Sequence, residues 1–226
     1  MRAIMVTRHG DLDLGERKQP GDTDVPDGAV RVRVKYAGVG FADVMAVRGG
    51  YPLSPNPPFS PGYECLGQVE QVGRAPAAGP PPFAVGDRVV ALLPRMGAYR
   101  EWLDSDARFL AKVPSEVSDA VAGALPLNYL TAYALIDRCA QLASGQSFLI
   151  HGGAGGVGTA ALELARLLGL RAFATASPST HDVIRALGTT PLNRHDGTWL
   201  RELKQLQTQN VDTAFNSFNA TSFTHS

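Results

Sequence analysis

A glycine-rich segment near the middle of the chain offers the clearest chemistry in the sequence. Gly153, Gly155 and Gly158 satisfy the pattern G-x-G-x-x-G. The apolar run 147–151 precedes the segment directly, and a stretch with apolar residues along one helical face follows over 157–168. A strand, a glycine turn and a helix in this order can bind the pyrophosphate of a dinucleotide through backbone amides at the helix N-terminus. The alternative, a flexible turn between two elements, requires no such order.

Each glycine has an expected task. Gly153 permits the tight turn, Gly155 lets the backbone approach the pyrophosphate, and Gly158 lets the helix pack closely against the strand. The predicted dinucleotide-binding residues of the segment are Gly153, Gly155, Gly156, Val157 and Gly158.

The residues after the next expected strand, 171–175, bear on the choice of nicotinamide cofactor. NAD-binding units place an acidic residue about 20 positions beyond the glycines, where it bonds the ribose 2′-hydroxyl. Here no carboxylate occurs before Asp182. Ser177 and Ser179 would tolerate a 2′-phosphate, and Arg194 could supply a cation, although a solvated surface arginine is an equal alternative. NADPH is therefore favoured over NADH.

Composition excludes several classes of function. Lys and Arg number 21, as do Asp and Glu, so the formal net charge is zero and no electrostatic footprint for nucleic acid or an acidic membrane is present. The two cysteines, Cys65 and Cys139, have no metal-ligand spacing and predict a reducing, cytoplasmic setting. The sequence contains no apolar run of about 18 residues and no signal-peptide pattern at its start.

The chain divides into two halves of different texture. Up to about residue 115, short alternating runs such as 29–36 and dense glycine and proline indicate a partly open β-barrel. From residue 116, a largely helical stretch over 118–139 precedes strands and helices that alternate. That alternation predicts a doubly wound parallel sheet and places the chain in the α/β class. The predicted domains are 1–115 and 116–226.

Several motifs together resemble the zinc-independent quinone oxidoreductases of the medium-chain dehydrogenase/reductase superfamily. Their order and spacing cover nearly the whole chain. The segments that carry the resemblance are 41–44 (FADV), 48–52 (RGGYP), 61–64 (PGYE), 85–89 (VGDRV), 127–133 (LNYLTAY) and 151–158 (HGGAGGVG). The resemblance implies a GroES-like catalytic barrel followed by a Rossmann domain, with the active site in the cleft between them.

The same resemblance argues against catalytic zinc. Zinc-dependent relatives carry a cysteine where this chain has Gly40, and a histidine where it has Tyr63. Catalytic zinc needs about three protein ligands, and Glu64 alone cannot hold the metal. The four-cysteine structural lobe of such relatives is also missing.

Without a Lewis acid, a conjugated acceptor suits hydride transfer, because it spreads the incoming charge onto oxygen. A quinone or an α,β-unsaturated carbonyl is the expected substrate, and hydrogen bonds to the developing oxyanion are the expected contribution of the protein. By resemblance, Tyr51 donates that hydrogen bond or a proton, whereas its alternative is packing on neighbouring prolines. Also by resemblance, Thr131 contacts the nicotinamide and Asn128 belongs to the cofactor site. A helix-interior threonine bonded to a carbonyl is the alternative for Thr131.

Three features depart from the resembling family. Gly40 and Thr180 stand where quinone reductases often have asparagine and lysine. The expected fourth strand of the dinucleotide domain, at 211–218, is followed by only a short stretch of chain, whereas a complete domain of this kind uses six strands in the order 3-2-1-4-5-6. We therefore expect an incomplete Rossmann domain, C-terminally truncated, with a homodimer possible only in a longer chain.

Three functions are consistent with these residues. The first is an NADPH-dependent quinone or enone reductase, whose turnover would persist in excess chelator. The second is an enoyl-thioester reductase, which shares the motifs. The third is a catalytically inactive NADPH-binding or interaction protein, suggested by Gly40 and the short C-terminus.

Overall fold

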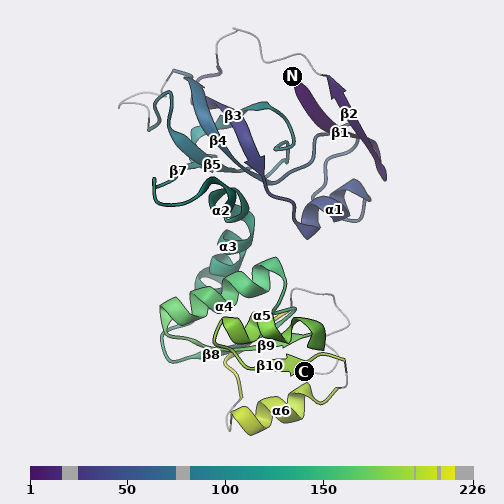
Figure 1. The fold of residues 1–226 in the computed structure, drawn as a ribbon, viewed down its shortest axis with the longest axis vertical. Coiled ribbons are helices and arrows are strands. Elements are labelled where there is room, and N and C mark those ends of the chain that lie inside the picture. Colours follow the sequence, from purple (N-terminus) through teal and green to yellow (C-terminus); the bar gives the residue numbers. More distant parts are fainter. Residues whose placement is uncertain (17–24, 75–81, 196, 208–209, 217–226) are drawn as a thin grey trace. The chain divides into compact units, whose positions relative to one another are not determined.

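The chain consists of two compact units, which divide after Leu127 (Figure 1). The computed structural model describes residues 1–16, 25–74, 82–195, 197–207 and 210–216. Unit 1 is Met1–Leu127 and unit 2 is Asn128–Ser226.

A five-stranded antiparallel sheet forms the body of unit 1, in the order β6-β3-β4-β5-β7. Its strands are β3 (Ala29–Ala37), β4 (Glu64–Val72), β5 (Arg88–Leu92), β6 (Trp102–Asp106) and β7 (Leu110–Lys112). Apolar side chains on one face, including Val32, Val69, Val89 and Leu103, pack into a common core. The alternation of apolar and polar residues along these runs is therefore explained by one buried face.

A second group of elements in unit 1 surrounds a smaller core. It comprises the hairpin β1 (Arg2–Arg8) and β2 (Asp11–Glu16), and helix α1 (Phe41–Val47). β1 is tied to the rest of the unit by the isolated bridges Ala3–Arg100 and Val6–Phe59. A short 3-10 turn, η1 (Ala107–Phe109), connects β6 to β7.

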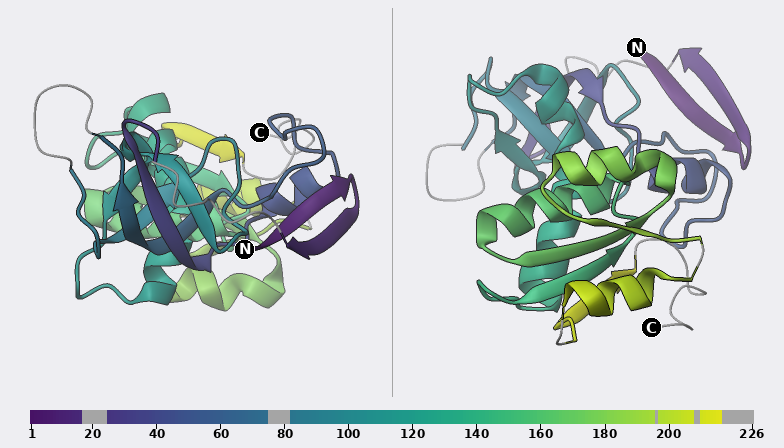
Figure 2. Two further views of the ribbon diagram at one scale, coloured as in Figure 1. Left: turned by 90° about the horizontal axis from the view of Figure 1, so that it is seen from above. Right: turned by 60° about the horizontal axis from the view of Figure 1, so that its bottom comes forward.

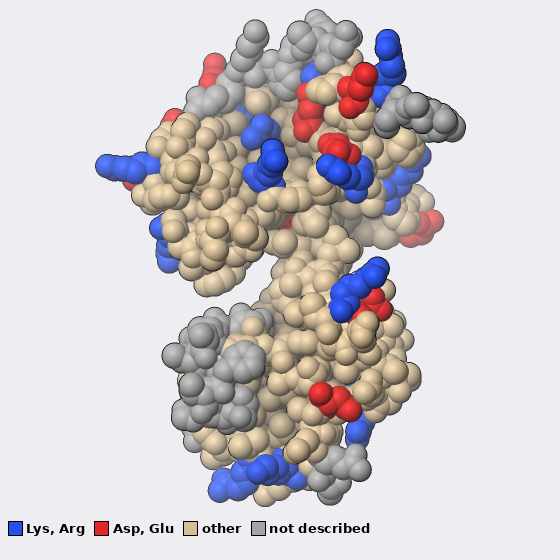
Figure 3. Space-filling model, turned by 180° about the vertical axis from the view of Figure 1, so that it is seen from behind, with Lys and Arg blue, Asp and Glu red and all other residues tan. Residues whose placement is uncertain are grey.

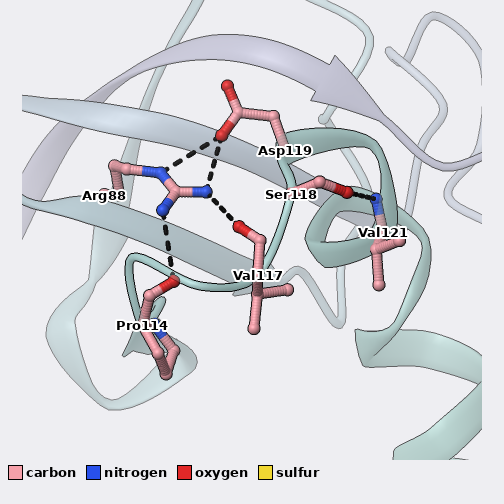
Figure 4. Close-up of polar contacts among 6 residues, drawn as sticks. All are labelled: Arg88, Pro114, Val117, Ser118, Asp119 and Val121. Carbon is pink, nitrogen blue, oxygen red and sulfur yellow. Dashed lines mark hydrogen bonds and ion pairs between the residues drawn. The ribbon is translucent and has the colours of Figure 1, made fainter.

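Arg88 anchors the segment that follows the sheet (Figure 4). Its guanidinium donates to Asp119 Oδ1 at 2.7 and 3.1 Å, and to the carbonyls of Pro114 at 3.2 Å and Val117 at 2.7 Å. Ser118, next to this contact, caps α2 (Asp119–Ala124) by accepting a hydrogen bond from the Val121 amide. The start of α2 is thereby fixed to β5.

The helical stretch then continues in two further pieces. α3 (Pro126–Tyr133) begins at a proline, which suits the first helical position because its missing amide would be unpaired there. A π-helical turn, η2 (Ala134–Cys139), ends the stretch. The sequence predicted the interruption at Pro126 correctly, but it gave no sign of the π geometry.

Unit 2 contains a four-stranded parallel sheet in the order β10-β9-β8-β11. Its strands are β8 (Ser147–His151), β9 (Arg171–Ala176), β10 (Pro191–Asn193) and β11 (Thr213–Asn216). Helices α4 (Gly156–Leu168) and α5 (His181–Ala186) cover one face and α6 (Trp199–Leu206) the other (Figure 2). The short turn η3 (Pro178–Thr180) leads from β9 into α5. The strand order confirms the doubly wound arrangement that the sequence predicted.

Strand β8 shows why the sheet is buried on both sides. Phe148 and Ile150 pack with α4 and α5, whereas Leu149 packs on the opposite face with Trp199 and Leu203 of α6. Every residue of β8 is buried. The continuous apolar centre of this strand, Phe148 to Ile150, is therefore the expected pattern for a central parallel strand.

The two tryptophans of the chain lie in different units. In unit 1, the Trp102 indole donates to Glu70, and the Arg33 guanidinium lies 5.3 Å from the ring centroid. In unit 2, Trp199 packs edge-on against His151, with ring centroids 5.1 Å apart. Each ring therefore has a distinct environment.

Charge is mixed on the molecular surface. On the face shown in Figure 3, basic and acidic side chains are interspersed over unit 1, as the net charge of zero suggests. Among the described residues, no helix has the length and apolar character that a membrane crossing requires.

Candidate cofactor-binding and active site

The glycine loop connects β8 to α4, and its shape depends on close packing at two positions. A Cβ on Gly153 would lie 2.5 Å from the Ala174 Cβ on β9, and a Cβ on Gly158 would lie 2.4 Å from the Gly152 carbonyl oxygen. Both distances are too short for a real side chain. Helix α4 can therefore approach the sheet only because glycine occupies these positions, as predicted for Gly158.

The tight turn, however, rests on Gly152 rather than on Gly153. Gly152 has a φ of +80°, a conformation that L side chains rarely adopt, whereas Gly153 is not among the residues with positive φ. The amides of both residues donate to the Thr175 carbonyl, at 3.1 and 2.9 Å. Gly153 is needed for close packing instead, because β9 lies directly against it.

The start of α4 presents backbone amides in the way that an anion site requires. Its N-cap residue, Gly155, forms no side-chain cap. The Gly155 amide donates to the Gly152 carbonyl at 2.9 Å, so it closes the turn. The amides of the next three residues, Gly156, Val157 and Gly158, belong to the first turn of α4. An uncapped helix N-terminus carries partial positive charge and suits a phosphate.

Asn128 lies against this loop. Its side-chain amide would be 2.7 Å from a Cβ on Gly156, so the two residues are in close contact. Thr131 follows one turn later on α3 and is exposed. The structure thus brings Asn128 to the glycine loop within unit 2.

A polar group forms where β9 and β10 end side by side. The Arg194 amide donates to the Ala176 carbonyl at 3.1 Å, and the Arg194 guanidinium donates to His195 Nε2 at 3.2 Å. The Ser177 hydroxyl lies 3.2 Å from the same nitrogen. Because that nitrogen accepts from Arg194, it carries no proton, and the Ser177 hydroxyl is the donor in its own contact.

The structure thus brings together two of the three residues predicted to bind a 2′-phosphate, and beside them lies His195, which the sequence did not single out. Ser177 and Arg194 share His195, whereas Ser179 is exposed in η3. The parallel pairing of β10 with β9 was the signal that could have identified His195, because residues just after paired parallel strands meet at one edge. The nearest carboxylate in sequence, Asp182, pairs with Arg185 at 2.7 Å on α5.

In unit 1, Tyr51 packs into the smaller core beside Tyr63. Their ring centroids are 5.9 Å apart in an edge-on arrangement, and Phe59 and Met96 belong to the same cluster. Tyr51 is half-buried. Burial, with smaller effects of Tyr51 and Asp43, raises the pKa of Tyr63 to about 12. Tyr63 therefore keeps its proton at neutral pH.

Two buried carboxylates hold the backbone around these tyrosines. Asp43 accepts from the amides of Gly40 at 2.8 Å and Gly62 at 3.2 Å. Glu64 accepts from the Leu127 amide at 2.7 Å, in the first turn of α3. Neither carboxylate forms an ion pair with Arg48 or Arg88 among the described residues. Backbone amides serve instead, and Arg88 is engaged by Asp119.

Other candidate groups have ordinary structural surroundings. Burial raises the pKa of the Cys65 thiol to about 12, so Cys65 is no nucleophile at neutral pH. His151 contacts the Thr175 hydroxyl at 3.0 Å, and burial lowers its pKa. Within the described part of the chain, no cluster of three or more His, Cys, Asp or Glu side chains is arranged to hold a metal ion.

Known proteins are similar to this chain over both units. The alcohol dehydrogenase GroES-like domain family matches residues 26–115. The human synaptic vesicle membrane protein VAT-1 homolog-like structure is 32% identical, with a TM-score of 0.83 over 95% of this chain and 67% of that chain. A mycobacterial protein complexed with NADPH is 30% identical, with a TM-score of 0.85 over 100% of this chain and 69% of that one. The CurK enoyl reductase is 25% identical, with a TM-score of 0.85 over 99% of this chain and 69% of that one.

Curated relatives are longer than this chain. The chain spans about half the length of the mouse and human VAT-1 homolog-like proteins, to which it is 32% identical over 213 residues. The chain belongs to the medium-chain dehydrogenase/reductase superfamily, in the branch that contains the quinone oxidoreductases and the VAT-1-like proteins.

Proposed function

We propose that the protein is a zinc-independent oxidoreductase that transfers hydride from NADPH to a quinone or an α,β-unsaturated carbonyl. The observation that carries the proposal is the uncapped N-terminus of α4 behind a closely packed glycine turn. A relative of the same fold is complexed with NADPH.

The end of β9 supports the phosphorylated cofactor. A ribose 2′-phosphate would be met there by Ser177, Arg194 and His195, and Asp182, the first carboxylate after the strand, is held by Arg185. A guanidinium and a hydroxyl favour a phosphate, whereas NAD sites use a carboxylate that would repel it.

Residue types in unit 1 support reduction without a metal. Gly40 and Tyr63 cannot ligate zinc, and both Asp43 and Glu64 are already bonded to backbone amides. When bound, NADPH supplies the hydride. A conjugated acceptor then places the new charge on oxygen, where a positioned hydroxyl can stabilise it.

Tyr51 is the residue that we assign to this hydroxyl. Its edge-on packing against Tyr63 restricts the ring, so the hydroxyl is held in a defined direction. Thr131 and Asn128 are assigned to the nicotinamide cofactor, since Asn128 adjoins the glycine loop.

The kinetics of NADPH oxidation with a quinone test the proposal. The purified chain is expected to oxidise NADPH with 1,4-benzoquinone, and the rate should persist in excess chelator. Tyr51→Phe should lower kcat by about 10- to 100-fold, the usual effect of one lost hydrogen-bond donor or acid, while the Kd for NADPH stays unchanged. Val85→Ala, an exposed change elsewhere in unit 1, is the control. Tight NADPH binding without turnover of any acceptor would contradict catalysis and favour a cofactor-binding protein.

A second candidate is reduction of an enoyl thioester, which the similarity to the CurK enoyl reductase favours. Crotonyl-CoA and free quinone should be compared at equal concentration. Turnover of the thioester alone would select this candidate.

A further inference from the structure

A cavity of about 520 Å³ lies in unit 1, beside the tyrosine core. Phe59 and Met96 form part of its wall and also belong to the cluster that contains Tyr51. Apolar side chains, three prolines, two serines and two arginines line it. They include Met5, Ser54, Phe59, Arg95, Met96 and Arg100. The volume is in the range of sites for small organic molecules.

Two polar atoms in the wall of this cavity are buried without a partner. Ser54 Oγ and Arg100 Nε have no hydrogen bond to any described residue. Buried polar groups are nearly always paired, because an unmade hydrogen bond costs about 1–3 kcal/mol. A hydroxyl and a guanidinium nitrogen in the wall of one cavity therefore need explanation.

The charge of the cavity is uncompensated as well. Neither Arg95, which is exposed, nor Arg100, which is partly buried, takes part in an ion pair among the described residues. Burial also lowers the pKa of Arg100, because it disfavours the charged form. Ser60 donates only a long bond, 3.5 Å, to the Tyr99 carbonyl.

Backbone contacts fix the chain positions of both residues. The Ser54 amide donates to the Tyr51 carbonyl at 3.0 Å, and Arg100 bridges to Ala3 of β1. Gly97 gives the Arg100 guanidinium room, since a Cβ there would lie 3.0 Å from Nη2. Both residues thus have fixed backbone positions at the wall of the cavity.

We propose that this cavity binds a small organic oxyanion with an apolar body. Its carboxylate or phosphate group pairs with the Arg100 guanidinium and accepts from the Ser54 hydroxyl, and Arg95 adds a second positive charge at the exposed side. The apolar body lies against Phe59, Met96 and Met5. This site is separate from the glycine loop, which belongs to unit 2.

Calorimetry with four probes tests the site. Octanoate and octyl phosphate represent the two oxyanions, octanol lacks the charge, and inorganic phosphate lacks the apolar body. Both anionic alkyl probes should bind at one site per chain, and octanol and inorganic phosphate should each bind at least about tenfold more weakly, as expected for loss of one charge-assisted hydrogen bond or of the apolar contacts. The preferred headgroup identifies the source of the ligand. Equal binding of octanol would overturn the proposal.

Substitutions test whether the binding of octanoate depends on the residues of this cavity. Arg100→Met keeps the apolar stem but removes the guanidinium, so octanoate affinity should fall by about tenfold or more. Ser54→Ala is a second, smaller change and should weaken binding in the same direction. Arg201→Met removes an exposed arginine of α6 and should leave the affinity unchanged.

Folding and cofactor binding are measured on the same variants. Arg100→Met should melt at or above the parent temperature, because it removes an unpaired buried group. The Kd for NADPH should be the same with and without saturating octanoate. Unchanged octanoate affinity in a folded Arg100→Met variant would contradict the proposal, whatever the outcome of the reductase assay.

Discussion

Ser177, Arg194 and His195 illustrate how function at the scale of single residues depends on which strands are neighbours. Eighteen positions separate Ser177 from His195, yet the two side chains touch because β9 and β10 end together. His195 in turn accepts from Arg194, which carries the charge.

Replacing Arg194 by Gln should weaken NADPH binding selectively. A hydrogen bond to a charged group contributes about 1.5–3 kcal/mol, so the Kd for NADPH should rise by about tenfold or more. The Kd for NADH should barely change, because NADH lacks the 2′-phosphate. Titration calorimetry with both cofactors measures this difference. Arg185→Gln removes an equivalent charge from α5 and serves as the matched control. Equal losses for NADPH and NADH would refute the assignment.

Glu64 predicts a dependence of stability on pH. Burial raises its pKa, partly offset by the Leu127 amide. A carboxyl with a raised folded-state pKa stabilises the fold fully below its unfolded pKa of about 4.3, and this contribution is lost as the pH rises through the folded-state value. Glu64→Gln can still accept from Leu127 but cannot ionise.

The melting temperature of Glu64→Gln relative to the parent should therefore increase between pH 4 and pH 7. Glu116 provides a control of opposite sign, since hydrogen bonds from its own amide and from Ser115 lower its pKa. A constant difference between Glu64→Gln and the parent across this range would show that the Glu64 carboxyl does not titrate differently in the folded state.

The sequence revealed the glycine loop because its motif is local, and it indicated that Arg194 directly follows a short strand, as it does. It did not reveal His195, whose role depends on a side-chain contact between strands. It also gave no sign of the backbone amides from which Asp43 and Glu64 accept, since main-chain partners leave no trace in residue types.

At the scale of elements, Arg88 connects a strand to the helix that follows the sheet. One guanidinium satisfies Asp119 and two carbonyls, and Asp119 lies at the first position of α2 (Figure 4). The motif 85–89 is thus explained by a structural contact rather than by catalysis.

Arg88→Gln should lower the free energy of unfolding by about 1–3 kcal/mol, because it leaves charged and carbonyl acceptors without donors. Urea unfolding measures the loss as a lower midpoint with an unchanged slope. Arg108→Gln breaks an exposed pair with Asp106 and should cost less than about 1 kcal/mol. Equal effects of the two changes would contradict the role of Arg88.

The elements of unit 2 were easier to predict than those of unit 1. β8 and α4 are adjacent, long and strongly patterned, and Gly169 ends α4 in the left-handed conformation with a φ of +68°. The order of the strands in unit 1 depends instead on pairs far apart in sequence, such as β3 with β6. The π geometry of η2 depends on packing that no residue pattern specifies.

At the scale of the whole molecule, each unit has its own core and its own tryptophan. Trp102 lies in β6 of unit 1, and Trp199 lies in α6 of unit 2. Trp199→Phe and Trp102→Phe therefore leave a single fluorophore in one unit or the other.

NADPH should stabilise unit 2 more than unit 1. A ligand present at about 100 times its Kd raises the stability of the unit that binds it by about 2.7 kcal/mol. The unfolding midpoint followed by Trp199 should shift by more than the midpoint followed by Trp102. Glycine-loop variants such as Gly158→Val should abolish the shift, while Leu167→Ala, on the exposed side of α4, should keep it. Identical shifts for both fluorophores would mean that the chain unfolds as one cooperative body.

The Thr175 carbonyl accepts from the amides of both Gly152 and Gly153, so these two amides are occupied before a dinucleotide binds. Hydrogen exchange should consequently divide the loop into two classes. The first two amides should exchange slowly in the free protein, and those of Gly156, Val157 and Gly158 should gain protection only with NADPH. The loop should therefore lose little conformational entropy when the dinucleotide binds, because the amides of Gly152 and Gly153 are already bonded to Thr175. The rigidity of the loop thus comes from the neighbouring strand β9 and not from the loop itself.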